Sequence, residues 1–90
     1  MVDQKFIEEL RRLVKEKKAI VGSNRTIKLL KLGKIAKVVM ARNVPEDIKK
    51  DIEYYAKLAN AEVVQLEVDN VELGAMVGKP FKVTVIGIPK

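Results

Sequence analysis

Two hydrophobic periodicities alternate along this chain of 90 residues, and this alternation constrains the fold more than any other feature. Apolar residues spaced three and four apart predict amphipathic helices, whereas the short β-branched runs between them predict buried strands. The clearest helical stripe comprises Ile48, Ile52, Tyr55, Ala56 and Ala59. Because helices that alternate with strands cover both faces of a sheet, the pattern predicts an α/β fold, a three-layer α/β/α sandwich.

Local signals set the expected boundaries, and a chain of this length suffices for one compact core, so we expect residues 1–90 to form a single domain. The first expected element is a helix capped by Asp3, which carries Phe6, Leu10, Leu13 and Val14 on one face and ends in the basic run 15–18. A strand over 19–21, a helix over about 24–32 stopped by Gly33, a strand over 37–42 and a helix with Pro45 in its first turn follow. The last three elements are a strand over 61–66, a short helix with a capping box of Asp69 and Glu72 that ends at Gly78, and a strand over 81–88 closed by Pro89. In the second helix, Ile27 and Leu30 are expected to pack on one side, with Leu29 and Leu32 roughly opposite.

The chain contains neither cysteine nor histidine. It therefore lacks disulfides, thiolate zinc ligands and thiol nucleophiles, as well as the commonest metal ligand and the side chain that titrates near neutrality. Catalysis by lysine, tyrosine or carboxylates stays open, but the composition favours a protein that is not an enzyme. We expect no metal and no cofactor.

No apolar run approaches the roughly 20 residues that a bilayer-spanning helix needs. The start, MVDQKFIEEL, lacks the basic end and apolar centre of a signal peptide. The sequence thus predicts a cytoplasmic protein with no membrane partner.

The net charge is +6, from 18 Lys and Arg against 12 Asp and Glu. Such an excess attracts polyanions, but it also fits a solvated surface with surplus lysine. The placement of the charges has to separate these two interpretations.

The stretch VGSNRTIKLLKLGK, residues 21–34, places a glycine directly before a basic helix. Gly22 permits close approach of a ligand, and the helix start presents unpaired N–H groups that suit a phosphate. Asn24 offers a donor and an acceptor to a base edge, Arg25 and Lys28 can bracket phosphates, and Thr26 can cap the helix or contact ribose. An equally favoured interpretation of this stretch is purely structural: Gly22 turns the chain and Ser23 caps the helix. Neither GxxxxGK[ST] nor GxGxxG is present, so this is no nucleotide loop.

Two further loops, 42–45 and 77–81, are also candidates. Taken alone, Asn43 and Pro45 read more simply as a helix start, and Gly78 with the following Lys79-Pro80 as a helix exit. Aromatic residues make up 4% of the chain, so we do not expect a platform for stacking single-stranded bases.

Three blocks carry a resemblance to a known family: VGSNRTIK with the following LGK, DIEYYAKLANAEV and NVELGAMVGKPFKVTVI. Together with the strand KVVMARN they cover nearly the whole chain from Ala19 to Ile88. In these blocks the chain resembles the archaeal and eukaryotic large-subunit ribosomal proteins of the L thirty-e family, within the superfamily of ribosomal proteins that bind kink-turns. The resemblance implies a four-stranded mixed sheet and a structural role in the ribosome. It further implies binding of ribosomal RNA at a kink-turn, which is a helix–internal loop–helix bent sharply at a bulge, by a protein that we expect to be monomeric when free.

Carried over by matching position, the resemblance implies an RNA-binding domain whose contacts come from three loops. The matched residues are Gly22, Ser23, Asn24, Arg25, Thr26 and Lys28, then Asn43, then Val77, Gly78, Lys79, Pro80 and Phe81. Asn24-Arg25 is similar to the Asn-Glu pair of guide-RNA-type kink-turn binders, but with the charge of the second residue reversed.

Three alternatives stand beside this interpretation. The first is a kink-turn protein of a guide-RNA modification particle, against which the DIEYYAKL block argues. The second is a small enzyme that uses the same helix start for a phosphoryl ligand, although it would lack His, Cys and a convincing carboxylate pair. The third is a protein-interaction module with incidental charge.

Overall fold

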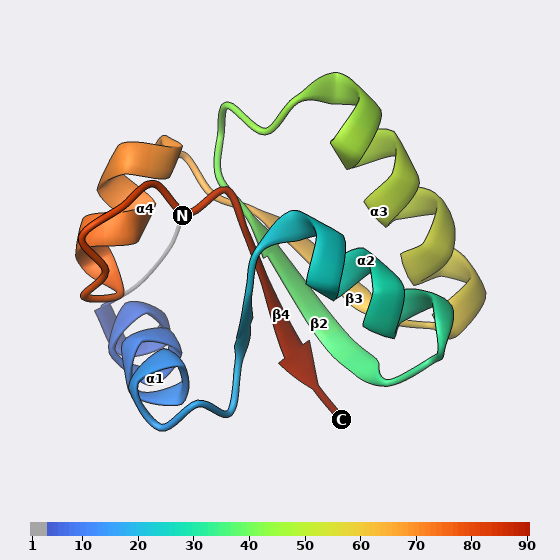
Figure 1. Cartoon of the computed structure of the whole chain (residues 1–90), viewed down its shortest axis with the longest axis horizontal. Helices are drawn as coiled ribbons and strands as arrows, with labels where there is room; N and C mark the ends of the chain where they lie inside the picture. The colour runs from blue at the N-terminus through green and yellow to red at the C-terminus, as the bar shows by residue number, and fades with distance from the viewer. Residues whose placement is uncertain (1–3) are drawn as a thin grey trace.

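The computed structural model describes residues 4–90, so the predicted cap at Asp3 lies outside the described residues. The elements in chain order are α1 (Gln4–Lys15), β1 (Ile20–Val21), α2 (Ser23–Lys31), β2 (Ile35–Met40), α3 (Glu46–Ala59), β3 (Glu62–Gln65), α4 (Asn70–Met76) and β4 (Val85–Pro89). The four strands form one sheet in the order β1-β4-β2-β3. Helices α1 and α4 lie on one side of it, and α2 and α3 on the other (Figure 1). The predicted three-layer α/β/α sandwich with a four-stranded mixed sheet is confirmed.

Strand β2 lies inside the sheet, as its apolar sequence predicts. It pairs parallel with β3, where Val38 is opposite Val63, and antiparallel with β4, where Val38 is opposite Gly87. Strand β4 also pairs antiparallel with β1. Because β4 runs opposite to both neighbours, its first residues lie beside the last residues of β1 and β2.

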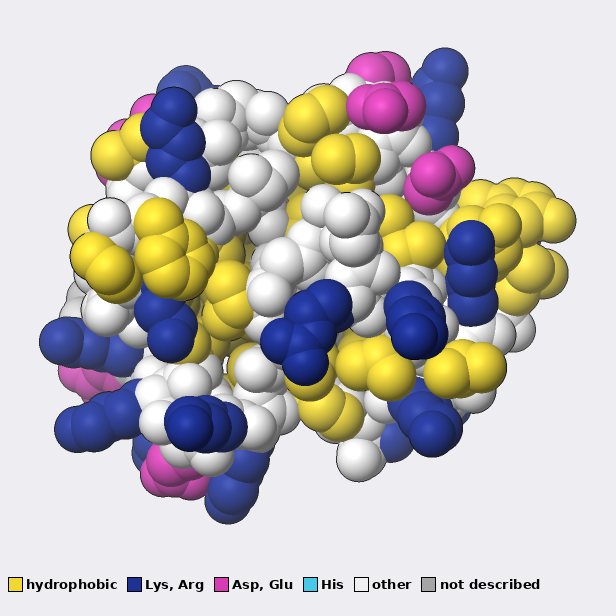
Figure 2. Space-filling view, in the orientation of Figure 1, with side chains coloured by type: hydrophobic (Ala, Val, Ile, Leu, Met, Phe, Trp, Pro, Cys, Tyr) yellow, Lys and Arg dark blue, Asp and Glu magenta, His cyan; other side chains and the backbone are white. Residues whose placement is uncertain are grey.

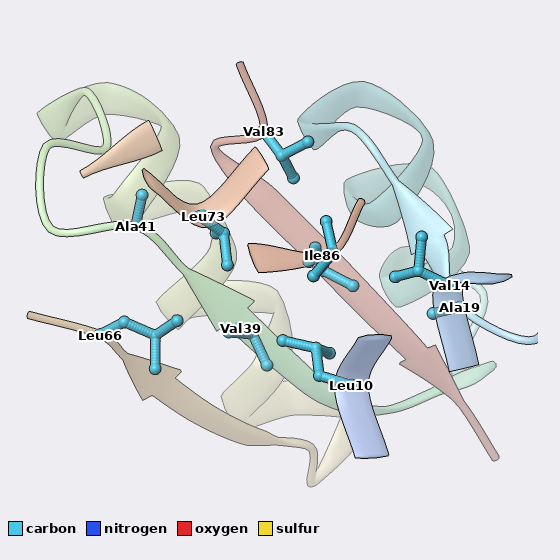
Figure 3. Packing of buried hydrophobic residues seen from close by; sticks show 10 residues of the cluster. Leu10, Val14, Ala19, Val39, Ala41, Leu66, Leu73, Val83 and Ile86 are labelled. Carbon is cyan, nitrogen blue, oxygen red and sulfur yellow. The ribbon is translucent and has the colours of Figure 1, made fainter. Parts of the chain in front are cut away.

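The core is divided in two by the sheet, because successive side chains of a strand point to opposite faces. Val39 and Ile86 belong to the cluster beneath α1 and α4 (Figure 3). Val38 and Val85 belong to the cluster beneath α2 and α3. All four side chains are fully buried. Both inner strands are therefore apolar on two faces, which explains their near-continuous hydrophobic runs.

The apolar stripe predicted for α3 packs against the sheet as expected. Ile52 and Ala56 are buried, and the other three members of the stripe pack against the same cluster. Pro45, however, precedes the helix instead of lying in its first turn, because its ψ of 143° is extended and not helical. In α1, the predicted face is likewise confirmed, with Leu10 and Val14 buried.

Helix α2 begins at Ser23, one residue earlier than predicted, and ends at Lys31. Leu30 is buried, and Ile27 and Leu29 pack against its cluster. The expected packing of Leu32 is wrong, since that side chain is 60% exposed. Leu32 follows the last helical residue, where the chain turns through Gly33 at a φ of 72°.

The final strand is shorter than predicted, because regular pairing begins at Val85 and not at Phe81. The amide of Val83 donates to the carbonyl of Asn70 in α4 (3.0 Å), so it is unavailable to a neighbouring strand. The carbonyl of Thr84 accepts from the amide of Ala41, the residue that follows β2 (2.8 Å). Helix α4 ends at Met76, before Gly78, while Asp69 caps it as predicted by accepting from Glu72 N (2.9 Å). Strands β2 and β3 differ from their expected bounds by one or two residues.

None of the helices within residues 4–90 combines the length and the apolar character that a membrane crossing requires.

Close contact between α4 and the segment that follows it depends on Gly74. A β-carbon at this buried glycine would collide with the carbonyl oxygen of Phe81. The carbonyl of Gly74 also accepts from Lys79 N (2.9 Å), so the returning chain lies directly on the helix.

We expect Gly74→Ala to lower the free energy of unfolding by about 1–3 kcal/mol, because it forces an extra atom into a packed contact. Helix propensity alone predicts the opposite sign, since alanine is favoured over glycine by about 1 kcal/mol inside a helix. Chemical denaturation measures the difference. The exposed neighbour Ala75 gives the control, Ala75→Gly, which should lose only the propensity term. A Gly74→Ala protein as stable as the wild type would contradict the contact.

Candidate nucleic-acid interface

One end of the sheet gathers the first two candidate loops and the residues that follow the third. We define this loop end as residues 22–25, 41–44 and 83–85. Gly22 N donates to Val85 O (2.9 Å), and Ala41 N donates to Thr84 O (2.8 Å). Figure 1 shows the start of α2 beside the segment that leaves β2 and the one that enters β4. The antiparallel placement of β4 therefore brings the predicted residues Gly22 and Asn43 to the same end of the sheet.

The start of α2 is open to a ligand. Gly22 occupies the N-cap position with a φ of 124°, a backbone conformation that favours glycine, and no side chain in the described part of the chain caps the helix. Nothing lies within 4 Å of where a β-carbon on Gly22 would sit. The alternative in which Ser23 caps the helix is wrong, because Ser23 is its first helical residue. A helix start without a side-chain cap leaves N–H groups available to an anion.

Exposed polar and basic side chains surround this helix start. Asn24, Arg25 and Lys28 are all exposed, and they lie within one turn of each other. Arg42, which sequence reasoning did not single out as a contact, is exposed at the exit of β2. Within residues 4–90, no carboxylate lies in ion-pair range of Arg25, Lys28 or Arg42. Their charges are therefore free to interact with a bound polyanion.

Thr26 does not belong to this exposed surface, contrary to expectation. Its side chain is fully buried, and its hydroxyl has no hydrogen-bond partner among the described residues. A β-carbon on Gly87 would lie 2.8 Å from Thr26 Cγ2, so α2 packs against β4 at this glycine. Thr26 therefore seats the helix on the sheet and offers no side chain to a ligand.

Asn43 is held in place by Asn70, a residue that sequence reasoning missed. Asn43 Oδ1 accepts from Asn70 N (2.9 Å), and Asn43 Nδ2 donates to Asn70 Oδ1 (3.2 Å). Asn70 Nδ2 in turn donates to Thr84 Oγ1 (3.5 Å). The first residue of α4 thus joins the exit of β2 to the entry of β4. The capping signal at Asp69 located this helix start, but it did not reveal the partner across the loop end.

The third candidate loop has a different location from the other two. Its first residues, Gly78 and Lys79, lie beside α1, because Arg11 Nε is 3.8 Å from where a β-carbon on Gly78 would be. Val77 is 3% exposed within the core cluster, so its side chain is not available for a contact, contrary to expectation. Pro80 and Phe81 are exposed, the latter by 56%. The third loop thus begins beside α1, and the chain that continues from it reaches the loop end at Val83 and Thr84.

Across residues 4–90, no group of three or more acidic side chains could hold a metal ion. The open helix start, the exposed cations and the paired asparagines instead define a class: a small α/β/α sandwich protein with a positively charged loop end suited to a folded polyanion.

Comparison with known proteins identifies the family. Residues 4–90 match the model of the ribosomal protein L7Ae/L30e/S12e/Gadd45 family, and the chain belongs to this family. A protein of Methanothermobacter thermautotrophicus, large ribosomal subunit protein eL30, is 61% identical over 71% of this chain and 65% of its own length. Proteins of the same name from Methanocaldococcus jannaschii and Sulfurisphaera tokodaii are 47% and 41% identical, over 86% and 92% of this chain and 70% and 78% of their own lengths.

Solved structures share the fold at much lower identity. A Giardia lamblia 15.5 kDa RNA-binding protein superposes with a TM-score of 0.85 at 16% identity, covering 100% of this chain and 78% of that chain. A Bacillus halodurans protein of unknown function superposes with a TM-score of 0.86 at 18% identity, covering 98% of this chain and 87% of that chain.

The expectation that the present chain is not an enzyme agrees with the ribosomal names of its relatives.

A double-mutant cycle tests whether Asn43 and Asn70 hold the loop end together. We expect the effects of Asn43→Ala and Asn70→Ala on the free energy of unfolding to be non-additive by about 0.5–3 kcal/mol, because a hydrogen bond joins the two side chains directly. Pairing Asn43→Ala with Asn60→Ala provides the control, since Asn60 ends α3 at the far end of that helix and should give an additive result. Additive effects in the Asn43–Asn70 cycle would show that the bond between these side chains does not hold the loop end together.

Proposed function

We propose that this protein is a structural RNA-binding protein of the large ribosomal subunit, present in the cytoplasm with the ribosome, and that its loop end recognises a kink-turn in ribosomal RNA. The proposal rests on the uncapped start of α2 at Gly22, which is hydrogen-bonded to β4 and surrounded by cations that have no carboxylate partner within residues 4–90. The relatives named large ribosomal subunit protein eL30 supply the ribosomal setting.

The first turn of α2 recognises phosphate in this proposal. The unpaired N–H groups and the positive end of the helix dipole favour an anion there. Gly22 leaves open space, so that an RNA backbone can approach without meeting a side chain. Arg25 and Lys28 then neutralise neighbouring phosphates, and each such contact releases counterions from the RNA.

The amide side chains of Asn24 and Asn43 recognise unpaired bases in this proposal. Asn24 is exposed and carries both a donor and an acceptor, which can pair with the edge of a base extruded from a bent internal loop. Asn43 keeps part of its hydrogen-bonding capacity after its two bonds to Asn70, and these bonds fix its orientation. Pro80 and the exposed ring of Phe81 add apolar surface in the third loop.

A preformed surface suits a protein that holds one RNA conformation. The backbone bonds of Gly22, Ala41 and Val83 fix all three segments before any ligand binds. Little conformational freedom is then lost by the protein on association, so the interaction energy stabilises the bent form of the RNA. The protein acts as a scaffold in this proposal and needs no cofactor.

Lys28→Ala tests this role of the helix start. We expect the variant to flatten the salt dependence of affinity for a kink-turn RNA by roughly 0.7–0.9 log units per log unit of salt, the slope expected for one phosphate contact. At 0.15 M salt the same term corresponds to about fivefold weaker binding. Filter binding at several salt concentrations measures both quantities.

The matched control is Lys57→Ala, which removes an exposed lysine from α3 on the same side of the sheet. Its salt slope should equal that of the wild type. An unchanged slope for Lys28→Ala would remove Lys28 from the interface. Equal affinity of the wild-type protein for a plain duplex of the same length would favour non-specific binding over kink-turn recognition.

A further inference from the structure

A groove of about 900 Å³ lies between the C-terminal half of α1 and the turn that follows α4. We call it the α1 groove and define it by Arg11, Arg12, Lys15 and Lys17 on one side and Lys79 on the other. Figure 1 shows the end of α4 beside α1. The buried side chains of Val14 and Val77 line its base. It lies across the sheet from α2 and α3, and its α1 wall belongs to none of the three candidate loops.

The lining of the α1 groove is strongly basic. Five basic side chains face two acidic ones, Glu8 and Glu16, which gives a net charge of +3. Glu16 forms ion pairs with Arg12 (3.9 Å) and with Lys18 (3.3 Å). Figure 2 shows the Lys and Arg side chains gathered over the α1 region at the lower left.

The remaining four cations of the groove stay uncompensated. Among residues 4–90, no carboxylate lies in ion-pair range of Arg11, Lys15, Lys17 or Lys79. Like charges held this close repel each other unless counterions or a polyanion neutralise them. The groove therefore concentrates a positive potential that an extended row of phosphates would satisfy.

The third loop connects the α1 groove to the proposed interface. Arg11 Nε lies 3.8 Å from the β-carbon position of Gly78, and Lys79 belongs to both the groove and the third loop. From Lys79 the chain runs over Gly74 to Val83, which is bonded to Asn70 at the loop end. The segment that joins α1 to the loop end thus carries two basic residues, Lys79 and Lys82.

We propose that the α1 groove binds the phosphate backbone of a double-stranded RNA stem that leaves the bent element held by the loop end. This inference rests on the proposed function and adds a second RNA contact on the other side of the sheet. Arg11 and Lys15, one turn apart on α1, contact successive phosphates, and Lys79 contacts the same strand from the opposite wall.

The lining favours RNA over an acidic protein segment. Protein interfaces depend on a few apolar or aromatic anchors in desolvated pockets. The α1 groove contains no aromatic residue, and its apolar side chains Val14 and Val77 are already buried in the core. Long basic side chains over a groove match the backbone contacts by which double-stranded RNA is recognised through its shape.

The test compares two synthetic RNAs that contain the same bent internal loop. One has stems of about three base pairs, and the other has one stem extended to about fourteen, which in the A-form geometry of duplex RNA exceeds the 29 Å length of the protein. Affinities of the wild type and of the double variant Arg11→Gln/Lys15→Gln are measured by filter binding at several salt concentrations.

For the long-stem RNA we expect the double variant to bind about twentyfold more weakly at 0.15 M salt, with a salt slope reduced by roughly 1.4–1.8. For the short-stem RNA its affinity should stay within about twofold of the wild type, because exposed charges beyond a Debye length are screened. The control variant Lys50→Gln/Lys57→Gln removes two exposed charges from α3 and should leave both RNAs unaffected.

Equal binding of the long-stem RNA by the wild type and the Arg11→Gln/Lys15→Gln variant would overturn the groove proposal while leaving the loop end in place. An acidic protein as the true ligand would give this same result. Failure of the wild-type protein to bind either RNA would instead overturn the proposed function and the groove together. Circular dichroism and thermal unfolding of the variant show that α1 remains folded in each case.

Discussion

Three consecutive residues at the entry of β4 each hydrogen-bond to a different part of the fold, and the loop end depends on these bonds. Val83 N donates to Asn70 in α4, Thr84 O accepts from Ala41 after β2, and Val85 O accepts from Gly22 before α2. Unpaired backbone groups are costly when buried, so this pairing strongly favours one arrangement. Segments from residues 22, 41 and 70 are thereby held at one end of the sheet by their backbones alone.

This arrangement decides where the excess positive charge can act. A net charge of +6 spread evenly would serve solubility. In the structure, Arg25, Lys28 and Arg42 stand exposed at or next to the loop end without carboxylate partners among the described residues, next to a helix start that offers its own N–H groups. Helix dipole and side-chain charges have the same sign there, so they reinforce each other at an anion.

Hydrophobic periodicity predicted the layers and the α3 stripe, and a local motif predicted the Asp69 cap. Each of these features depends on residues close together in the chain. Sequence reasoning did not predict that Thr26 and Val77 are buried or that β4 starts at Val85. Thr26 lies four residues before the buried Leu30, so helical spacing could have indicated its burial, but its polar character favoured the surface. The bond between Asn43 and Asn70 joins residues 27 apart, and no local pattern encodes it.

The central claim, that the loop end is the RNA-binding surface, is tested most directly by amide chemical shifts of the free and RNA-bound protein. With a bent internal-loop RNA added, the account predicts the largest changes at the amides of 22–28 and 41–44, with the solvent-facing residues of α3 unchanged. Changes concentrated on the outer face of α3, with Gly22 and Asn43 unaffected, would contradict it.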